Sequence, residues 1–103
     1  MPTNEELYAE HERLKDEGKL EEAAAALEKA IAQDANYTLA YSALAVLYGK
    51  LGRHDDAIRQ GLKVCELAPK DPFSFTAMSV TYQRAGKIPE AEDAMAQART
   101  IQG

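Results

Sequence analysis

The side chains that could do chemistry in this 103-residue chain are adjacent acid pairs, two histidines and one cysteine. Glu21-Glu22 and Asp55-Asp56 would suggest acid–base catalysis if both carboxyl groups of a pair faced one substrate. Neighbouring residues of a helix point about 100° apart, so these carboxylates diverge. Acids in the first turn of a helix complement the helix dipole. We therefore interpret both pairs as helix starts.

The histidines and two lysine-containing motifs do not form a site either. His11 and His54 lie 43 residues apart, and neither has a ligand of matching type three or four positions further along, as a helical metal site would need. GKL at 18–20 and GKI at 86–88 lack the second glycine and the Ser or Thr after lysine that a phosphate loop requires. We predict that the protein is not an enzyme and uses no metal or cofactor.

The composition is that of a folded protein with a mild acidic excess. Hydrophobic residues make up 46% and charged residues 28%, which suffices for one core. A net charge of -5 argues against a nucleic-acid partner. The start, MPTNEELYAE, has no secretory signal pattern, and apolar runs such as AAAAL are too short for membrane insertion. Since Cys65 is the only cysteine, we expect a reducing, cytoplasmic location.

A sequence repeat of 34 positions predicts the secondary structure that carries these residues. Chemically similar residues recur three times at this spacing, and such a period is typical of stacked supersecondary units. The matching triplets are Gly18, Gly52 and Gly86; Ala23, Ala57 and Ala91; Leu7, Tyr41 and Phe75; Leu14, Tyr48 and Tyr82; Ala30, Val64 and Ala98; and Glu22, Asp56 and Glu90.

Each unit is predicted to be a pair of helices. In residues 38–52 the large and small apolar side chains fall at i, i+3, i+4 and i+7, which is one helical stripe. Gly52 is placed to end this helix in a left-handed conformation, and Pro69 to stop the next one. Asp71 followed by proline predicts the start of the third unit, and Thr3 with Glu6 predicts a capping box at the first. A single hairpin cannot bury its apolar face, but three stacked hairpins can.

The chain resembles the tetratricopeptide repeat (TPR) family over almost its whole length. The resemblance implies one all-α domain, residues 1–103, in which three helix-turn-helix units of about 4–37, 38–71 and 72–103 form a short right-handed solenoid of six helices with a concave groove. The family pattern is met in the second unit by Tyr41, Leu44, Ala45, Tyr48, Gly52, Ala57, Val64 and Pro69. The first unit departs from it at Glu10, His11 and Ala35.

Polar residues replace small or apolar ones at both ends of the array. We expect Glu10, His11 and Arg13 on an outer face of the first helix that meets water, with His54 in a turn. Glu92 and Arg99 likewise make the last helix polar. Terminal repeats of solenoids need polar caps, so we expect a complete three-repeat protein that is chiefly monomeric, with a homodimer as an alternative.

The resemblance also implies where a partner binds, because the first helix of each TPR unit lines the groove. The middle of this surface is apolar with small side chains, which suits an apolar peptide or an amphipathic helix of another protein. An alternative is that some of these side chains, Val46 and Val80 above all, pack adjacent units together. The candidate partner-binding residues are Tyr8, Glu12, Leu39, Ser42, Ala43, Val46, Lys50, Phe73, Thr76, Ala77, Val80 and Arg84.

Two further expectations concern which protein is bound. One TPR subfamily holds the terminal carboxylate of chaperone tails with Lys, Asn and Arg; the corresponding residues here are Tyr8, Glu12, Ala43, Phe73 and Ala77, none of which can hold a carboxylate. We therefore expect no binding of such tails. The alternative function is structural self-association through the groove or the convex face.

Overall fold

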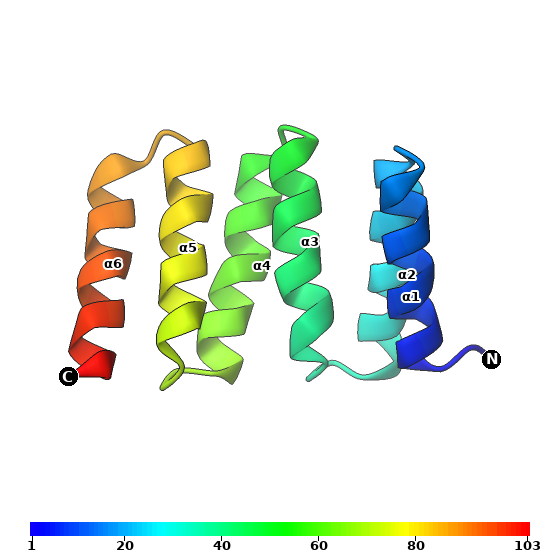
Figure 1. The fold of residues 1–103 in the computed structure, drawn as a ribbon, viewed down its shortest axis with the longest axis horizontal. Coiled ribbons are helices and arrows are strands. Elements are labelled where there is room, and N and C mark those ends of the chain that lie inside the picture. The colour runs from blue at the N-terminus through cyan, green and yellow to red at the C-terminus, as the bar shows by residue number, and fades with distance from the viewer.

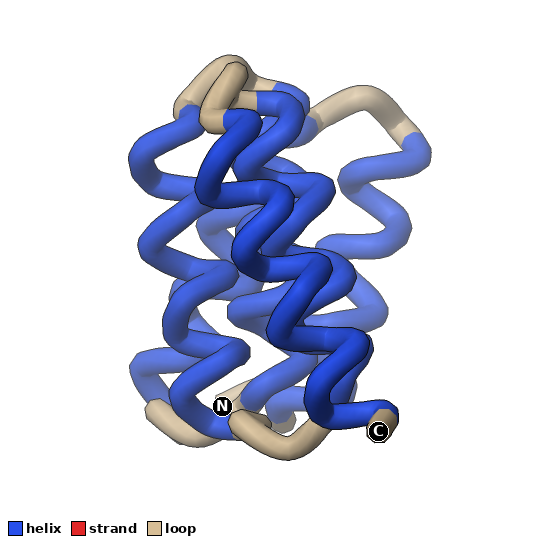
Figure 2. Tube along the Cα trace, turned by 90° about the vertical axis from the view of Figure 1, so that its left-hand side faces the viewer, coloured by secondary structure: helices blue, strands red, loops and turns tan.

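The computed structural model describes residues 1–103, and all of its regular structure is helical. The six helices form three hairpins that follow one another along the longest axis, 41 Å, of a molecule 25 Å and 18 Å across (Figure 1). Short turns join the helices at alternating ends (Figure 2). The two termini lie at the same end of the helices but at opposite ends of the long axis (Figure 1). The helices are α1 (Asn4–Asp16), α2 (Leu20–Gln33), α3 (Thr38–Lys50), α4 (His54–Leu67), α5 (Pro72–Arg84) and α6 (Ile88–Gln102).

Local signals fix where the helices begin and end. The Thr3 hydroxyl accepts a hydrogen bond from the Glu6 N–H at 3.1 Å, and the Glu6 carboxylate accepts one from the Thr3 N–H at 3.0 Å, which confirms the capping box. Asp71 caps α5 by accepting from the Phe73 N–H at 3.0 Å. Gly52 closes the turn after α3 with φ of +77°, the left-handed conformation that its place in the sequence predicts.

The core runs between the hairpins. A cluster of eleven buried side chains joins the first two hairpins, and a smaller cluster of Cys65, Met78 and Ala94 joins the second to the third. Cys65 therefore has a packing position between repeats. Its thiol lies 3.6 Å from the carbonyl oxygen of Ser74, and burial raises its pKa. Small residues such as Ala23 and Ala57, at most 1% exposed, let the helices approach closely.

The expectation for the histidines is wrong. His11 is 3% exposed, and its Nδ1 lies 2.6 Å from the carbonyl oxygen of Tyr8. Its register equals that of Ala45 and Ser79, which are also buried, so this face of α1 packs inside the stack and does not form an outer surface before the first unit. His54 is the first residue of α4 and does not lie in the turn. Glu10 and Arg13 are exposed, as predicted.

Candidate protein-binding groove

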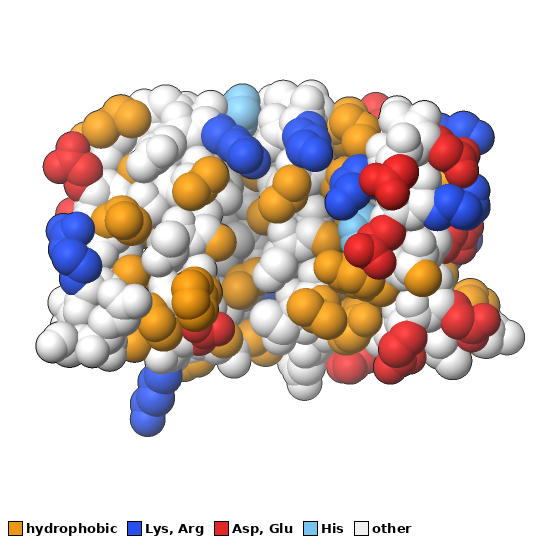
Figure 3. All heavy atoms as spheres, in the orientation of Figure 1, with side chains coloured by type: hydrophobic (Ala, Val, Ile, Leu, Met, Phe, Trp, Pro, Cys, Tyr) orange, Lys and Arg blue, Asp and Glu red, His pale blue; other side chains and the backbone are white.

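One broad face of the molecule is formed by the first helix of each hairpin. In Figure 1, α1 lies in front of α2 and α3 in front of α4. The same face in Figure 3 carries hydrophobic side chains over α3 and α5, basic ones near one end of these helices, and acidic ones over α1. We refer to this surface of α1, α3 and α5 as the groove face. It has the location that the sequence predicts for partner binding.

Four large apolar side chains on the groove face are left uncovered. Phe73 is 74% exposed and Leu39 is 56% exposed, both near the starts of their helices. Val46 and Val80, each about two helical turns further along, are 43% and 41% exposed. These two valines are thus less exposed than the two residues near the helix starts, but much of their surface still meets solvent.

A hollow of about 290 Å³ opens between α3 and α5. It brings together five of the predicted residues: Ser42, Val46, Ala77, Val80 and Arg84. The remaining lining residues are Ala45, Gly61, Val64, Ser74, Met78 and Thr81.

The floor of this hollow includes residues of α4, which the sequence reasoning did not assign to the site. Gly61 and Val64 reach it because α4 packs behind α3 and α5. A Cβ atom on Gly61 would lie 2.7 Å from the Met78 sulfur, so the glycine is what allows the second and third hairpins to come this close. A glycine within a helix, as here in α4, is the sequence signal that indicates such close packing.

Several predicted residues lie outside the hollow. Tyr8 and Ala43 pack against the larger core cluster and are half-buried. The ring of Tyr8 stands edge-on to those of His11 and Tyr37, with centroids 4.4 Å and 6.5 Å away. Thr76 is exposed, and its hydroxyl donates to the Pro72 carbonyl oxygen at 3.1 Å. Tyr8 and Ala43 therefore contribute to packing as well as to the groove face.

The remaining predicted residues are Glu12, Leu39, Lys50 and Phe73, which are all exposed on the groove face. Glu12 also acts on the buried histidine beside it. Burial lowers the pKa of His11, its hydrogen bond to the Tyr8 carbonyl opposes this, Lys15 lowers it further and Glu12 raises it.

Both acid pairs lie at helix starts, as predicted, and Asp56 also has side-chain partners. Glu21 and Glu22 lie in the first turn of α2, and Asp55 and Asp56 in that of α4. Asp56 accepts a hydrogen bond from Arg53 at 2.8 Å, and this bond holds the pKa of its carboxyl below the usual range. No group of three His, Cys, Asp or Glu side chains is arranged to hold a metal ion. None of the six helices has the length and apolar character needed to cross a membrane.

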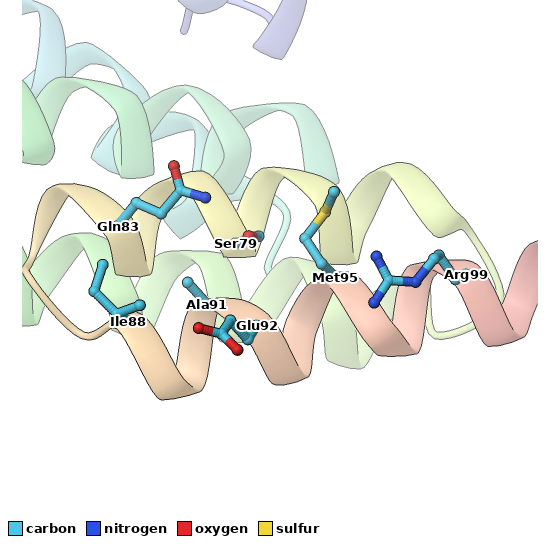
Figure 4. A pocket seen from close by; sticks show the side chains of 7 residues that line it. All are labelled: Ser79, Gln83, Ile88, Ala91, Glu92, Met95 and Arg99. Atoms are coloured by element: carbon cyan, nitrogen blue, oxygen red, sulfur yellow. The ribbon is translucent and has the colours of Figure 1, made fainter.

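A second hollow, of about 520 Å³, lies at the end of the stack between α5 and α6 (Figure 4). Glu92 and Arg99 line it and are exposed, as the polar-cap argument requires, but Ile88 and Met95 are 49% and 37% exposed there too. This end face is less polar than we expected. The hydroxyl of Ser79 is buried beside the hollow without a hydrogen-bond partner.

Stacked hairpins with one continuous groove face define a helical-repeat protein. The chain belongs to the tetratricopeptide repeat family. A TPR repeat model matches residues 12–52, and a tetratricopeptide repeat model matches residues 39–71. No curated protein sequence matches the chain significantly.

Solved structures extend the likeness to all three hairpins. The crystal structure of MamA matches with a TM-score of 0.87 and 25% identity, over 97% of this chain and 58% of that one. YrrB, described as a TPR protein with an unusual peptide-binding site, matches with a TM-score of 0.86 and 24% identity, over 99% and 53%. The second TPR of Spaghetti (RPAP3), bound to the HSP90 peptide SRMEEVD, matches with a TM-score of 0.83 and 19% identity, over 96% and 92%. The chain spans a little over half of the MamA and YrrB chains.

Proposed function

We propose that this protein is a non-catalytic interaction module that binds a peptide or amphipathic helix of a partner protein on its groove face. The observation that carries the proposal is the hollow between α3 and α5, with Leu39 and Phe73 exposed beside it. Exposed apolar patches on folded proteins usually mark interaction sites. The similar structures of YrrB and Spaghetti, whose descriptions mention peptide binding, support the same kind of function.

The bound segment would cover the apolar side chains and fill the hollow. A ligand side chain that enters between Val46 and Val80 loses contact with water and meets small neighbours such as Ala77. Single grooves of this size typically give micromolar affinity, on the order of -8 kcal/mol. The backbone of the ligand would lie over the small residues Ser42 and Ala77, which leave it room.

The partner that we propose is not a chaperone tail held by its terminal carboxylate. Tyr8, Ala43 and Ala77 carry no charge to pair with it, and Glu12 is an exposed acid that repels it. For an acidic peptide that does bind the groove face, replacing the terminal carboxylate by an amide should therefore leave the affinity unchanged, and a large loss on amidation would contradict this part of the proposal. We place the protein in the cytoplasm, with no nucleic-acid partner, because of its acidic charge and its single, buried cysteine.

The experiment that tests the function is a pull-down from the source cells with three forms of the protein. Leu39→Asp/Phe73→Asp removes the apolar side chains of the groove face. Leu62→Asp is the matched control, because Leu62 is an exposed leucine, 47% accessible, that lies on α4 outside the hollow. Circular dichroism checks that all three fold alike. A partner retained by wild type and Leu62→Asp but lost by the double variant supports the groove, and equal retention by all three overturns it.

The alternative function, self-association, is distinguished by molecular mass at two protein concentrations. A mass that doubles at the higher concentration, and stays monomeric in Leu39→Asp/Phe73→Asp, would favour a homodimer through the groove face. A mass that doubles in this variant too would favour the convex face. A monomer at both concentrations favours binding of a different protein.

A further inference from the structure

The charges of the groove face are separated along the stack. Lys50 on α3 and Arg84 on α5 have the same register in successive repeats, and neither forms an ion pair within the chain. The residue in this register on α1 is Asp16. The sign of the charge thus changes from the first repeat to the second and third.

The first repeat adds two more acids to the same face. Glu5 and Glu12 are exposed on α1, and neither they nor Asp16 form an ion pair. Lys15 offsets one of these three charges. Their counterparts in the second repeat, Leu39 and Val46, are apolar. The groove face therefore has an acidic end on α1, an apolar middle and a basic end formed by α3 and α5.

The basic end adjoins the hollow. The side chain of Arg84 lines the hollow and lies over Gly49 of α3, where a Cβ atom would be 3.9 Å from its Cδ and Nη1. Position 49 is thus within van der Waals reach of the arginine, and Lys50 follows on the same helix. A ligand group that fills the hollow therefore lies beside Arg84, a cation without a partner.

We propose that the groove face recognises a short segment of a partner protein with a defined charge order. The segment has acidic side chains next to Lys50 and Arg84, an apolar side chain in the hollow, and a basic side chain next to Glu5 and Glu12. This inference rests on the proposed function. Complementary charges select the partner and its orientation more than they add to raw affinity.

The test is a selection of random twelve-residue peptides displayed on phage, with purified full-length protein as the bait. Wild type is compared with Leu39→Asp/Phe73→Asp, which removes apolar contacts, and with Lys50→Glu/Arg84→Glu, which reverses the basic end. We expect wild type to enrich peptides in which acids and bases flank an apolar residue on opposite sides. The most enriched sequence is then synthesised with a fluorescent label, together with a version whose acids are replaced by the corresponding amides.

Fluorescence anisotropy measures the two affinities. We expect the acidic peptide to bind Lys50→Glu/Arg84→Glu at least about tenfold more weakly than wild type, and the amide version to bind wild type with a similar loss. The difference should shrink at high salt, which screens exposed charges.

The outcomes separate this inference from the proposed function. The inference would be overturned if the enriched peptides need Leu39 and Phe73 but show no charge order, or if they bind Lys50→Glu/Arg84→Glu as well as wild type. The proposed binding to the groove face would still stand in that case. The same result with a lower melting temperature of that variant would mean that Lys50 and Arg84 only complement the ends of their helices. Absence of any peptide that depends on Leu39 and Phe73 would overturn both.

Discussion

The phenol of Tyr48 on α3 donates a hydrogen bond to the carboxylate of Glu28 on α2, and so links the first two hairpins. Arg53 lies over the other side of this ring, 4.3 Å from its centroid, and holds Asp56 through its guanidinium. Burial raises the pKa of Tyr48 to about 12, and the bond to Glu28 acts in the same direction. The link depends on the tyrosine remaining protonated.

Removing the Tyr48 hydroxyl should weaken the contact between the first two hairpins. Tyr48→Phe keeps the buried ring and loses the bond to Glu28, so we expect a loss of about 1 kcal/mol in the free energy of unfolding. Urea denaturation of Tyr48→Phe, Glu28→Ala and the double variant forms a double-mutant cycle. If the two single losses simply add, the pair does not couple the hairpins.

Acid should destabilise the protein through His11. Its folded pKa is lowered by burial, whereas the unfolded chain takes up the proton near pH 6.5. The unfolded state therefore binds more protons as the pH falls below about 6.5, and stability is lost from there down to the lower folded pKa. Melting curves of wild type and His11→Ala between pH 5.5 and 7.5 test this. The variant has the alanine of the second repeat and should lose less stability on acidification; parallel curves would contradict the prediction.

Substitutions at two glycines of the second hairpin should change the free energy of unfolding in opposite directions. Gly52→Val places a branched side chain at φ of +77° and should cost about 1–2 kcal/mol from backbone strain alone, because no atom lies within 4 Å of a Cβ there. Gly49→Ala lies within α3, meets Arg84 only at 3.9 Å, and should stabilise by about 0.5–1 kcal/mol. Urea denaturation compares them, and equal effects would mean that the turn after α3 is not left-handed.

The close contact of the helices predicts the cost of a larger side chain. Ala57 on α4 is 1% exposed, so Ala57→Leu should overpack the core and cost roughly 1–3 kcal/mol. Ala32→Leu is the matched control, since Ala32 is exposed on α2 and has room for the larger side chain. A melting temperature of Ala57→Leu that equals wild type would mean that residue 57 does not face a neighbouring helix.

The sequence predicts the helices well because several of their ends carry local signals. The capping box of Thr3 and Glu6 and the turn at Gly52 depend on residues a few positions apart. The burial of His11 does not, because it depends on how α1 packs in three dimensions, whereas a polar side chain in this register indicates an outer surface. Gly61 lies in the floor of the hollow because α4 approaches α5 closely, and no local sequence pattern predicts the distance between these helices.

The core consists of two hydrophobic clusters along the stack, and this arrangement affects how the protein folds and unfolds. Each helix packs chiefly on its neighbours along the sequence, so folding does not wait for distant segments to meet. The third hairpin is held to the second through the cluster of Cys65, Met78 and Ala94. The hollow between α3 and α5 spans that same junction. A ligand bound in this hollow would hold α3 and α5 together. We therefore expect slower amide hydrogen exchange throughout α5 and α6 when the groove is occupied.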